Sequence, residues 1–600
     1  MTAQTLPRRT EVPVDMTWDL SSIYQNNDLW EADFVKVSGM LPKIKTYQGR
    51  LNSSASTLLE ALTLVDTAAE IVGRLYVYAN MRSHEDLNDS TYQALADRVT
   101  TLSAELSSAA SFTTPEILSI SAKQLDEWVD KTAGLKVYRH QFDELNRRRP
   151  HVRTAEVEAL LADASEVMES SDRVYSLLTN ADFKLPKVPD AQGNDVQLSQ
   201  GNYVARFLES HDRDERKRAF EAMLGTYNDY KNTISATYSA RVKADMFCAR
   251  ARNYENCLHQ ALESINVPVN VYTTLVQTVE KNLPALHRYL RLRKKVLGLP
   301  ELHMYDLYVP MVKEVDYKIA FEHAREKVVE ALAPLGADYV NSLKQGMLSR
   351  WIDVVETHGK RSGAYSWGTY GTNPFVLLNY QESMDSMFTL AHEMGHSMHS
   401  FFTRKSQPFQ YADYTLFVAE VASTCNEALL TDYLLKNTDD KALRMYIINH
   451  ALEGFRTTLY RQTLFAEFEM KAHEAAESGQ ALTPEFLCSI FKELNQKYYG
   501  AEVVIDDAIE IEWARIPHFY SSFYVYQYAT GISAATALAK QIVNEGQPAV
   551  KRYLGFLSSG SSDYSIELLR KAGVDLSSPQ PIQEALDTFS KYVDEFDSLI

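Results

Sequence analysis

The sequence predicts a mainly α-helical protein with one small β-sheet directly before a helix that carries two histidines. Apolar residues recur at steps of three and four over long stretches, as from Leu58 to Tyr76 and from Ile582 to Phe596. This is the stripe of an amphipathic helix that packs on a neighbour. Alternation with period two, which would indicate half-buried strands, is scarce. A chain of 600 residues exceeds what one small core needs, so several compact parts are expected.

The composition is that of a globular protein with an acidic balance. Hydrophobic residues make up 45% and charged residues 23%, which argues against disorder. The formal net charge is -18 at pH 7. A nucleic-acid-binding protein needs a basic face that displaces counterions from phosphates. We therefore expect no nucleic-acid partner, and we interpret the net charge as a source of solubility.

Cysteine usage and the first residues indicate a cytoplasmic protein. The chain has four cysteines, and no two have Cys-x-x-Cys spacing, so a reducing compartment fits better than a disulfide framework. No apolar segment follows Arg8 and Arg9, which argues against a secretory signal. No stretch reaches the roughly 18 apolar residues of a membrane helix, so no membrane partner is expected.

One break in the helical pattern is the candidate domain boundary. Residues 183–198 contain two prolines and a turn-forming segment at 190–195, which predicts a hairpin or a linker. We expect an N-terminal helical domain of residues 1–200 that ends in this segment. A second domain, residues 201–600, would carry the two histidines.

A second break predicts the small sheet. Glycine and aromatic residues at 363–368 are followed by a short apolar run at 374–380. Such runs favour short strands. The sheet would lie just before the helix that carries the histidines.

That helix contains a His-Glu-x-x-His motif. His392 and His396 are four residues apart, so they lie about 40° apart around a helix and one turn above each other. Two imidazoles so placed can bind one metal ion, and Glu393 can reach a water on that ion and take its proton. The motif also occurs by chance. On its own it is as compatible with two histidines of an ordinary helix as with a zinc site.

A downstream glutamate supplies a third ligand. A catalytic zinc needs three protein ligands and an open position. Glu420 and Glu427 are seven residues apart in an apolar segment, so both lie on one helical face, where an inward carboxylate is costly unless it binds a partner. We assign Glu420 as third ligand, and Glu427 as a residue that orients a ligand histidine. His399 competes with Glu420, but three histidines on one helix would strain a tetrahedron, so His399 is expected behind the ligands or beside the substrate.

With these residues in place, the sequence resembles the thimet-oligopeptidase-like zinc metallopeptidases, and within them the oligoendopeptidase F branch. The resemblance rests on His392 to His396, on the Glu-x-x-Ser-x-x-x-Glu segment of residues 420–427, and on segments 17–24, 362–366 and 517–531. These segments span nearly the whole chain in the order that the family has.

The resemblance implies a two-lobed helical ellipsoid with a deep substrate channel and one Zn²⁺ ion per chain at its floor. It implies a catalytic domain within residues 201–600 that cleaves short unfolded peptides internally and excludes folded proteins. Short peptides are then the expected partners. The sequence gives no indication of the oligomeric state. Cys425 stands where this branch is expected to have an aromatic residue, a difference that concerns packing near the site.

A tyrosine-rich segment offers groups for the oxyanion that forms on the attacked carbonyl. His518, Tyr524 and Tyr528 lie close together in the chain, and Tyr524 and Tyr528 would share a face if the segment were helical. In a chain with 35 tyrosines, an aromatic stripe is more often part of a core. The resemblance favours function, because the family has a histidine and tyrosines beside the substrate in this part of the chain.

The residues Gly363, Ala364 and Tyr365 form the start of the predicted sheet. An edge strand there could pair with the backbone of a bound peptide, which suits broad specificity. A purely structural hairpin is an equally good interpretation.

Two alternatives to an endopeptidase remain. A zinc aminopeptidase would share the motif, but it needs a device that captures the free α-amine, and no clear acidic motif for it is present. A non-catalytic helical scaffold that binds peptides would be expected to lack a ligand or Glu393. Both histidines and both glutamates are present.

Overall fold

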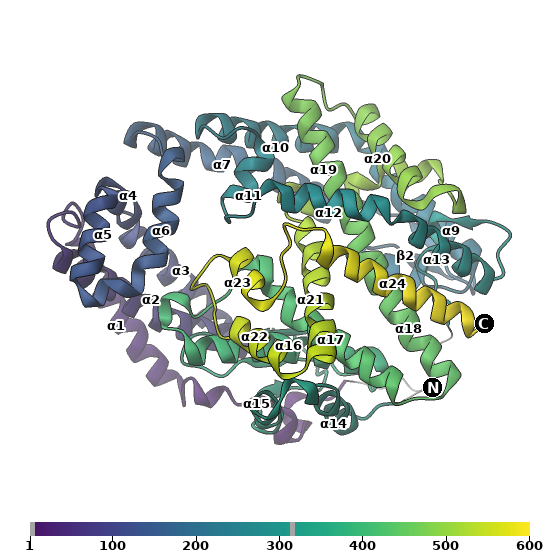
Figure 1. Ribbon diagram of the computed structural model, residues 1–600, viewed down its shortest axis with the longest axis horizontal. Helices are drawn as coiled ribbons and strands as arrows, with labels where there is room; N and C mark the ends of the chain where they lie inside the picture. Colours follow the sequence, from purple (N-terminus) through teal and green to yellow (C-terminus); the bar gives the residue numbers. More distant parts are fainter. Residues whose placement is uncertain (1–5, 313–317) are drawn as a thin grey trace. The chain divides into compact units, whose positions relative to one another are not determined.

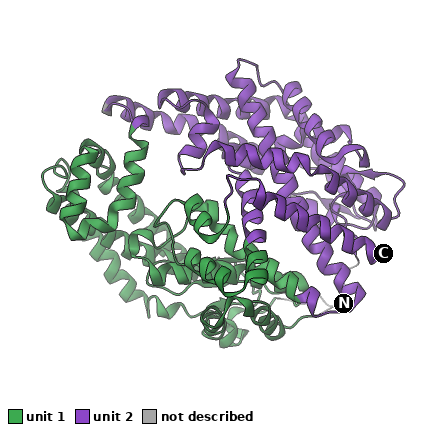
Figure 2. Cartoon of the chain, in the orientation of Figure 1, with its two compact units in different colours: residues 1–149, 317–433, 538–574 green, residues 150–316, 434–537, 575–600 purple. Residues whose placement is uncertain are grey.

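The computed structural model describes residues 6–312 and 318–600, which form two compact units (Figures 1 and 2). Unit 1 comprises residues 1–149, 317–433 and 538–574, and unit 2 comprises residues 150–316, 434–537 and 575–600. Helices dominate both units, and the strands are short. The predicted mainly α-helical class is therefore confirmed, while the two-lobed shape and the channel stay predictions.

Unit 1 is built from long helices around an apolar core. Its helices are α1 (Asn27–Lys45), α2 (Ala55–Glu85), α3 (Ser90–Ala110), α4 (Thr113–Ser119), α5 (Ala122–Lys131), α6 (Arg139–Arg148), α14 (Phe321–Ala331), α15 (Ala337–Leu348), α16 (Met384–Ser406), α22 (Gln547–Leu557) and α23 (Ser565–Ala572). Helix α2 packs against both α1 and α3. Leu58 and Leu75 of α2 and Trp30 of α1 are fully buried between these helices. The amphipathic helix predicted from Leu58 to Tyr76 lies within α2.

A three-stranded sheet in unit 1 precedes α16. Its strands are β4 (Ile352–Asp353), β5 (Tyr365–Trp367) and β6 (Phe375–Leu377), in the order β4-β6-β5. β4 is parallel to β6, and β5 is antiparallel to it, with Ser366 opposite Val376. The predicted small sheet before the histidine helix is confirmed. Within the sheet as described, β5 is an edge strand with β6 as its neighbour.

Unit 2 contains most of the remaining helices. They are α7 (Ala155–Leu177), α8 (Gln200–Asn202), α9 (Arg213–Asp229), α10 (Lys231–Ala251), α11 (Cys257–Glu263), α12 (Val269–Lys281), α13 (Leu283–Val296), α18 (Lys441–Phe455), α19 (Arg461–Glu477), α20 (Pro484–Tyr499) and α24 (Gln580–Ser598). Two further helices, α17 (Leu416–Lys436) and α21 (Tyr526–Glu545), contain residues of both units. The apolar stripe predicted from Ile582 to Phe596 lies on α24 and is buried against α13 and α18.

Two small strand pairs complete unit 2. β1 (Lys187–Pro189) and β2 (Asp195–Gln197) form an antiparallel hairpin, which confirms the hairpin predicted for residues 183–198. β3 (Leu302–His303) runs parallel to β7 (Val503–Val504). A domain boundary at residue 200 stays a prediction. In the described residues, no helix is long and apolar enough to cross a membrane.

Candidate active site

Helix α16 places the two histidines of the motif on one face. The Ser383 side chain caps the helix by accepting a hydrogen bond from the backbone N–H of Ser386 at 3.1 Å. Asp385 in the first turn complements the helix dipole. One turn apart, the His392 and His396 rings have centroids 4.9 Å apart. The half-buried rings point away from a core-facing side on which Leu390, Ala391 and Met394 are buried.

Helix α17 comes into close contact with α16 at Gly395. A Cβ atom on this residue would lie 2.5 Å from the Cα of Ser423 and 2.7 Å from the backbone oxygen of Ala422. A side chain is therefore excluded, and glycine allows the two backbones to meet. The buried Asn426 of α17 adds a bond from its side-chain amide to the backbone oxygen of Ala391 at 3.1 Å. Gly395 was not predicted as a site residue, although a glycine within a helix is a signal for close packing.

This contact brings Glu420 of α17 opposite the histidines. Its Oε2 atom lies 3.3 Å from Nε2 of His392 and 3.4 Å from Nε2 of His396. One donor atom from each residue falls within 4.8 Å of the others. Ligand atoms about 2.1 Å from zinc at tetrahedral angles are about 3.4 Å apart, so the three side chains fit a zinc ion. The structure thus brings together the three predicted ligands.

The protonation of His392 also fits a cation. Nδ1 of His392 lies 2.5 Å from Oε1 of Glu427, so this nitrogen carries the proton that Glu427 accepts. In the neutral ring, Nε2 then presents a lone pair to Glu420, itself an acceptor. A cation between the two atoms resolves this repulsion. Without a cation, a proton on Nε2 removes the same repulsion: burial disfavours a charged ring, but hydrogen bonds with Glu420 and Glu427 raise the pKa of His392 to about 10.

Glu393 is buried beside these ligands. Among the described residues, its Oε2 atom has no hydrogen-bond partner, which leaves it available to a water or a substrate. Burial and the charge of Glu420 raise the pKa of the Glu393 carboxyl, while the two histidines lower it. The net shift is upward, as suits a group that exchanges protons during a reaction.

Hydrogen bonds of its side chains hold the edge strand β5 next to Glu393. The hydroxyl groups of Ser366 in β5 and Ser397 in α16 are 2.7 Å apart. Tyr365 points its hydroxyl toward Nδ1 of the buried His84, at 2.7 Å. Gly363 has a φ of +85° and leads into the strand through Ala364. The predicted residues Gly363, Ala364 and Tyr365 thus lie together at the edge of the sheet.

His399 lies away from the donor atoms, in the interior of unit 1. Its ring is stacked on Tyr414, with centroids 3.7 Å apart, and lies against Phe556. Burial and the nearby His396 lower the pKa of His399 to about 3, so the ring is neutral. Its role as a residue behind the ligands or beside the substrate stays a prediction. Cys425 is buried as well, and its thiol faces Tyr553.

The predicted tyrosine and histidine residues form a group of their own in unit 2. His518 lies in the 3₁₀ helix Pro517–Tyr520. The ring centroids are 6.3 Å apart for His518 and Tyr524, 6.0 Å for His518 and Tyr528, and 5.5 Å for Tyr524 and Tyr528. Helix α21 begins at Tyr526, so Tyr524 precedes the helix. The contact between the Tyr524 and Tyr528 rings therefore does not come from a shared helical face. The three rings meet across a turn.

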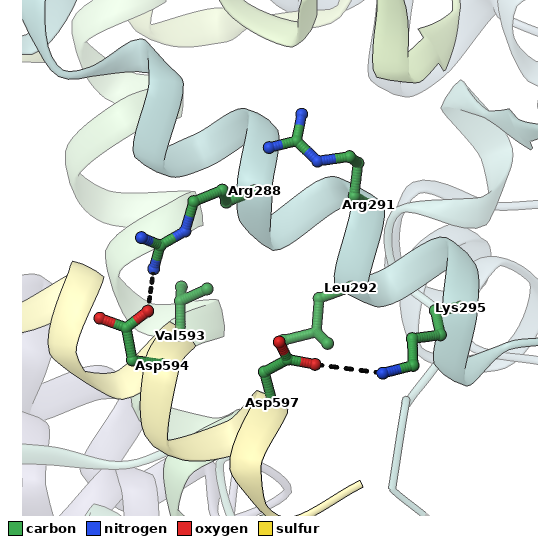
Figure 3. Close-up of a pocket in the computed structure, with 7 residues that line it drawn as sticks. All are labelled: Arg288, Arg291, Leu292, Lys295, Val593, Asp594 and Asp597. Atoms are coloured by element: carbon green, nitrogen blue, oxygen red, sulfur yellow. Dashed lines mark hydrogen bonds and ion pairs between the residues drawn. The ribbon is translucent and has the colours of Figure 1, made fainter.

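A surface pocket of about 270 Å³ lies between α13 and α24 of unit 2 (Figure 3). Arg288 pairs there with Asp594 at 2.5 Å, and Lys295 with Asp597 at 3.2 Å. None of the predicted site residues lines this pocket. Its charges bridge the two helices, and we assign it a structural role.

A mainly helical fold with this arrangement of two histidines and two glutamates defines a metallopeptidase. The profile of peptidase family M3 matches residues 206–588, and the profile of oligopeptidase F matches residues 116–184. The first match covers more than half of the chain, and the chain belongs to peptidase family M3. The predicted boundary at residue 200 falls between the two matched segments.

Bacterial relatives match over the whole chain. Oligopeptidase PepF of Bacillus subtilis (strain 168) is 49% identical, covering 100% of this chain and 89% of the relative. An oligoendopeptidase F homolog of Lactococcus lactis subsp. lactis (strain IL1403) is 42% identical, covering 99% and 98%. The predicted resemblance to oligoendopeptidase F is confirmed.

Solved structures share the fold. A candidate peptidase from Chlamydophila abortus has a TM-score of 0.93 at 36% identity, covering 99% of this chain and 100% of that one. Oligoendopeptidase F from Enterococcus faecium has a TM-score of 0.75 at 38% identity, covering 96% and 99%. The protein is thus a peptide-hydrolysing metallopeptidase of the oligopeptidase type.

Proposed function

We propose that the protein is a zinc-dependent endopeptidase that hydrolyses internal bonds of short, unfolded peptides. One observation carries the choice of metal: Nε2 of His392 and Nε2 of His396 lie 3.3 and 3.4 Å from the same oxygen of Glu420. Two imidazoles and a carboxylate are ligands that zinc prefers, and a three-ligand set leaves a position open for catalysis.

The three ligands would hold one zinc ion, and Glu393 would act as the base. When bound, zinc lowers the pKa of a coordinated water and polarises the peptide carbonyl. Glu393 takes the proton of the attacking water and passes it to the leaving amine. Its unpartnered Oε2 atom supports this role. Glu427 orients His392 by holding the Nδ1 proton.

The edge strand β5 would bind the backbone of the peptide. Its outer side has no partner strand within the described sheet, and the Ser366–Ser397 contact holds it against the helix that carries Glu393. An added strand is recognised through main-chain hydrogen bonds, which would allow a broad choice of side chains. Gly363, Ala364 and Tyr365 are the residues that we expect to contact the peptide.

The ring group of unit 2 would act on the oxyanion. We assign to Tyr528 a hydrogen bond that strengthens as charge develops on the attacked carbonyl oxygen, with His518 and Tyr524 as supporting groups. The mutual ring contacts of these residues and the family resemblance support the assignment.

Metal analysis combined with peptide digestion tests the proposal. Purified protein should contain about one zinc per chain by mass spectrometry, the stoichiometry of a single three-ligand site. A peptide library read by mass spectrometry should show internal cuts, and these should stop on chelation and return with zinc. Active protein that is free of transition metal would overturn the choice of cofactor. Removal of single N-terminal residues only would instead indicate an aminopeptidase.

A further inference from the structure

The turn that precedes Tyr524 contains an unusual backbone conformation. Phe523 has a φ of +58°, in the left-handed region that bulky side chains avoid because Cβ approaches the backbone. Its ring is buried. The conformation therefore persists only where surrounding groups fix it, and such strain is concentrated at functional sites.

Glu469 of α19 is one group that fixes this turn. Its Oε1 atom accepts the backbone N–H of Phe523 at 2.9 Å. The Glu469 side chain is fully buried, and its second oxygen is without a hydrogen-bond partner in the part of the chain that the structure describes. Burial and the nearby Asp245 raise the pKa of the Glu469 carboxyl well above its ordinary value. An uncharged carboxyl explains how the group stays in the core.

Asp245 of α10 fixes the preceding residue. It accepts a hydrogen bond from the Ser522 hydroxyl at 2.7 Å and another from Arg241 at 2.6 Å. His473 of α19 links the Asp245 carboxyl to the backbone of Glu469. Its Nε2 lies 3.3 Å from Asp245, and its Nδ1 lies 2.9 Å from the backbone oxygen of Glu469. The His473 ring also packs on the Phe523 ring, with centroids 4.5 Å apart.

Two neighbouring residues of the turn are thus held from two helices. Ser522 is bound to α10 through its side chain, and Phe523 is bound to α19 through its backbone. Tyr524 follows immediately, and its ring lies against Tyr528 in the first turn of α21. A shift of the turn would therefore move both tyrosine rings.

We propose that Glu469 and Asp245 are positioning residues for Tyr524 and Tyr528. They hold the Ser522–Phe523 turn in one conformation, and through it they hold the tyrosine hydroxyls where the reaction needs them. This inference rests on the proposed role of the tyrosines in stabilising the oxyanion. Neither carboxyl is assigned any contact with the peptide.

The main test compares two replacements of Glu469. Glu469→Leu removes the acceptor, and kcat on a short peptide should fall by about 10 to 100-fold, the size expected for misplaced catalytic groups. KM and zinc content should stay at wild-type values. Glu469→Gln retains an oxygen that can accept the Phe523 N–H, so it should restore kcat. Glu474→Leu, at an exposed position of the same helix, is the matched control and should behave as wild type.

A double-mutant cycle with Tyr528→Phe separates this inference from the proposed function. If Glu469 acts through Tyr528, Glu469→Leu should slow the Tyr528→Phe enzyme little further. If Tyr528→Phe alone turns over at the wild-type rate, the oxyanion role fails and the inference falls with it. If Tyr528→Phe lowers kcat but Glu469→Leu does not, only the inference is overturned. The same holds if the double variant shows the product of the two single losses in kcat.

Ser522→Ala covers the case in which Glu469→Leu does not fold. Ser522 is half-buried, so loss of its hydroxyl should be tolerated, and kcat should still fall several-fold with KM unchanged, as for a slightly displaced group. A wild-type kcat for Ser522→Ala, measured on protein with full zinc content, would overturn the role of Asp245.

Discussion

Glu427 accepts a hydrogen bond from Nδ1 of His392 across the contact between α17 and α16, at 2.5 Å. This bond fixes which nitrogen of His392 faces the proposed metal position, and it would make that nitrogen a better electron-pair donor to a metal ion. The pairing links a residue outside the ligand set to the strength of metal binding.

Replacing Glu427 should therefore weaken zinc binding without removing a ligand. We expect Glu427→Ala to lower the zinc affinity by about 10 to 100-fold, the usual loss for a carboxylate that orients a ligand histidine. Competition with a fluorescent chelator measures this loss. Glu493→Ala, at an exposed position of α20, should leave the affinity unchanged. Equal affinities for the two variants would remove Glu427 from the site.

Replacing Glu393 should separate chemistry from metal binding. Glu393→Gln keeps the size of the side chain but removes the base. Zinc content should stay at one per chain, while kcat falls by about 10² to 10⁴-fold, the usual contribution of general base catalysis. Near-normal turnover of a zinc-loaded Glu393→Gln enzyme would show that another group takes the proton.

Gly395→Ala should force α16 and α17 apart. The new methyl group would lie within 2.8 Å of three backbone atoms of Ala422 and Ser423, so we expect a loss of about 1–3 kcal/mol in the free energy of unfolding, as for other overpacked sites. Zinc affinity should fall too, because Glu420 moves with α17. Chemical denaturation and chelator competition measure the two effects.

Gly39→Ala is the matched control for this change. Gly39 lies inside α1 of the same unit, and a Cβ atom there meets nothing within 4 Å. Replacing a helical glycine by alanine at such a position stabilises by about 0.5–1 kcal/mol. If both glycine variants were stabilised, the close contact at Gly395 would be refuted.

The free energy of unfolding should depend on pH through Asp306 in unit 2. Its buried carboxylate pairs with Arg213 at 2.9 Å and Arg216 at 2.6 Å. Burial alone would raise the pKa of Asp306, but hydrogen bonds from the two arginines bring it below the ordinary value. The pair therefore stabilises the fold above the unfolded pKa of about 3.9. This stabilisation is lost as the pH falls through the folded pKa.

Asp306→Asn should remove this acid dependence. At pH 7 we expect a loss of about 3–5 kcal/mol in the free energy of unfolding, because the buried Arg216 and the half-buried Arg213 lose their counter-charge. Between pH 5 and 3 the wild type should lose stability faster than the variant in urea denaturation. Asp163→Asn, at an exposed position of α7, should keep the wild-type slope. If the free energy of unfolding fell equally with pH for the wild type and Asp306→Asn, the role of Asp306 would be contradicted.

Short peptides should be cut and folded proteins spared. A folded substrate would first have to unfold against a stability of about 5–15 kcal/mol. The comparison uses a short peptide and a stable folded protein that contains the same sequence, and the same protein destabilised by mutation is the control. We expect cleavage of the peptide and of the destabilised protein. Equal rates on all three would mean that substrate folding is no barrier.

Local patterns in the sequence predicted much of the fold. Apolar residues that recur every three or four positions predicted α2 and α24, because a helix that buries one face has apolar residues at that spacing. The prolines and turn residues near position 190 predicted the β1–β2 hairpin. The three proposed metal ligands were predicted because His392 and His396 are close together in the sequence, and because a glutamate in the apolar context of α17 needs a partner.

Features that depend on distant segments were missed. Tyr524 and Tyr528 would share a helical face only if their segment were helical throughout, but Phe523 adopts a left-handed conformation and α21 begins only at Tyr526. The groups that fix this conformation come from α10 and α19, and no local pattern joins them. The one available signal was Glu469 within an apolar run of α19, where a carboxyl has to be buried.

The position of β5 at the rim of its sheet has a further consequence for the protein in a crowded solution. An open strand edge accepts any extended chain, including a strand of another copy, and so invites aggregation. Here the edge is only three residues long, Tyr365 to Trp367, and Gly363 turns the chain just before it. A foreign chain gains few hydrogen bonds on so short a template. The same brevity should allow cleaved fragments to leave quickly and keep the molecules from sticking to one another.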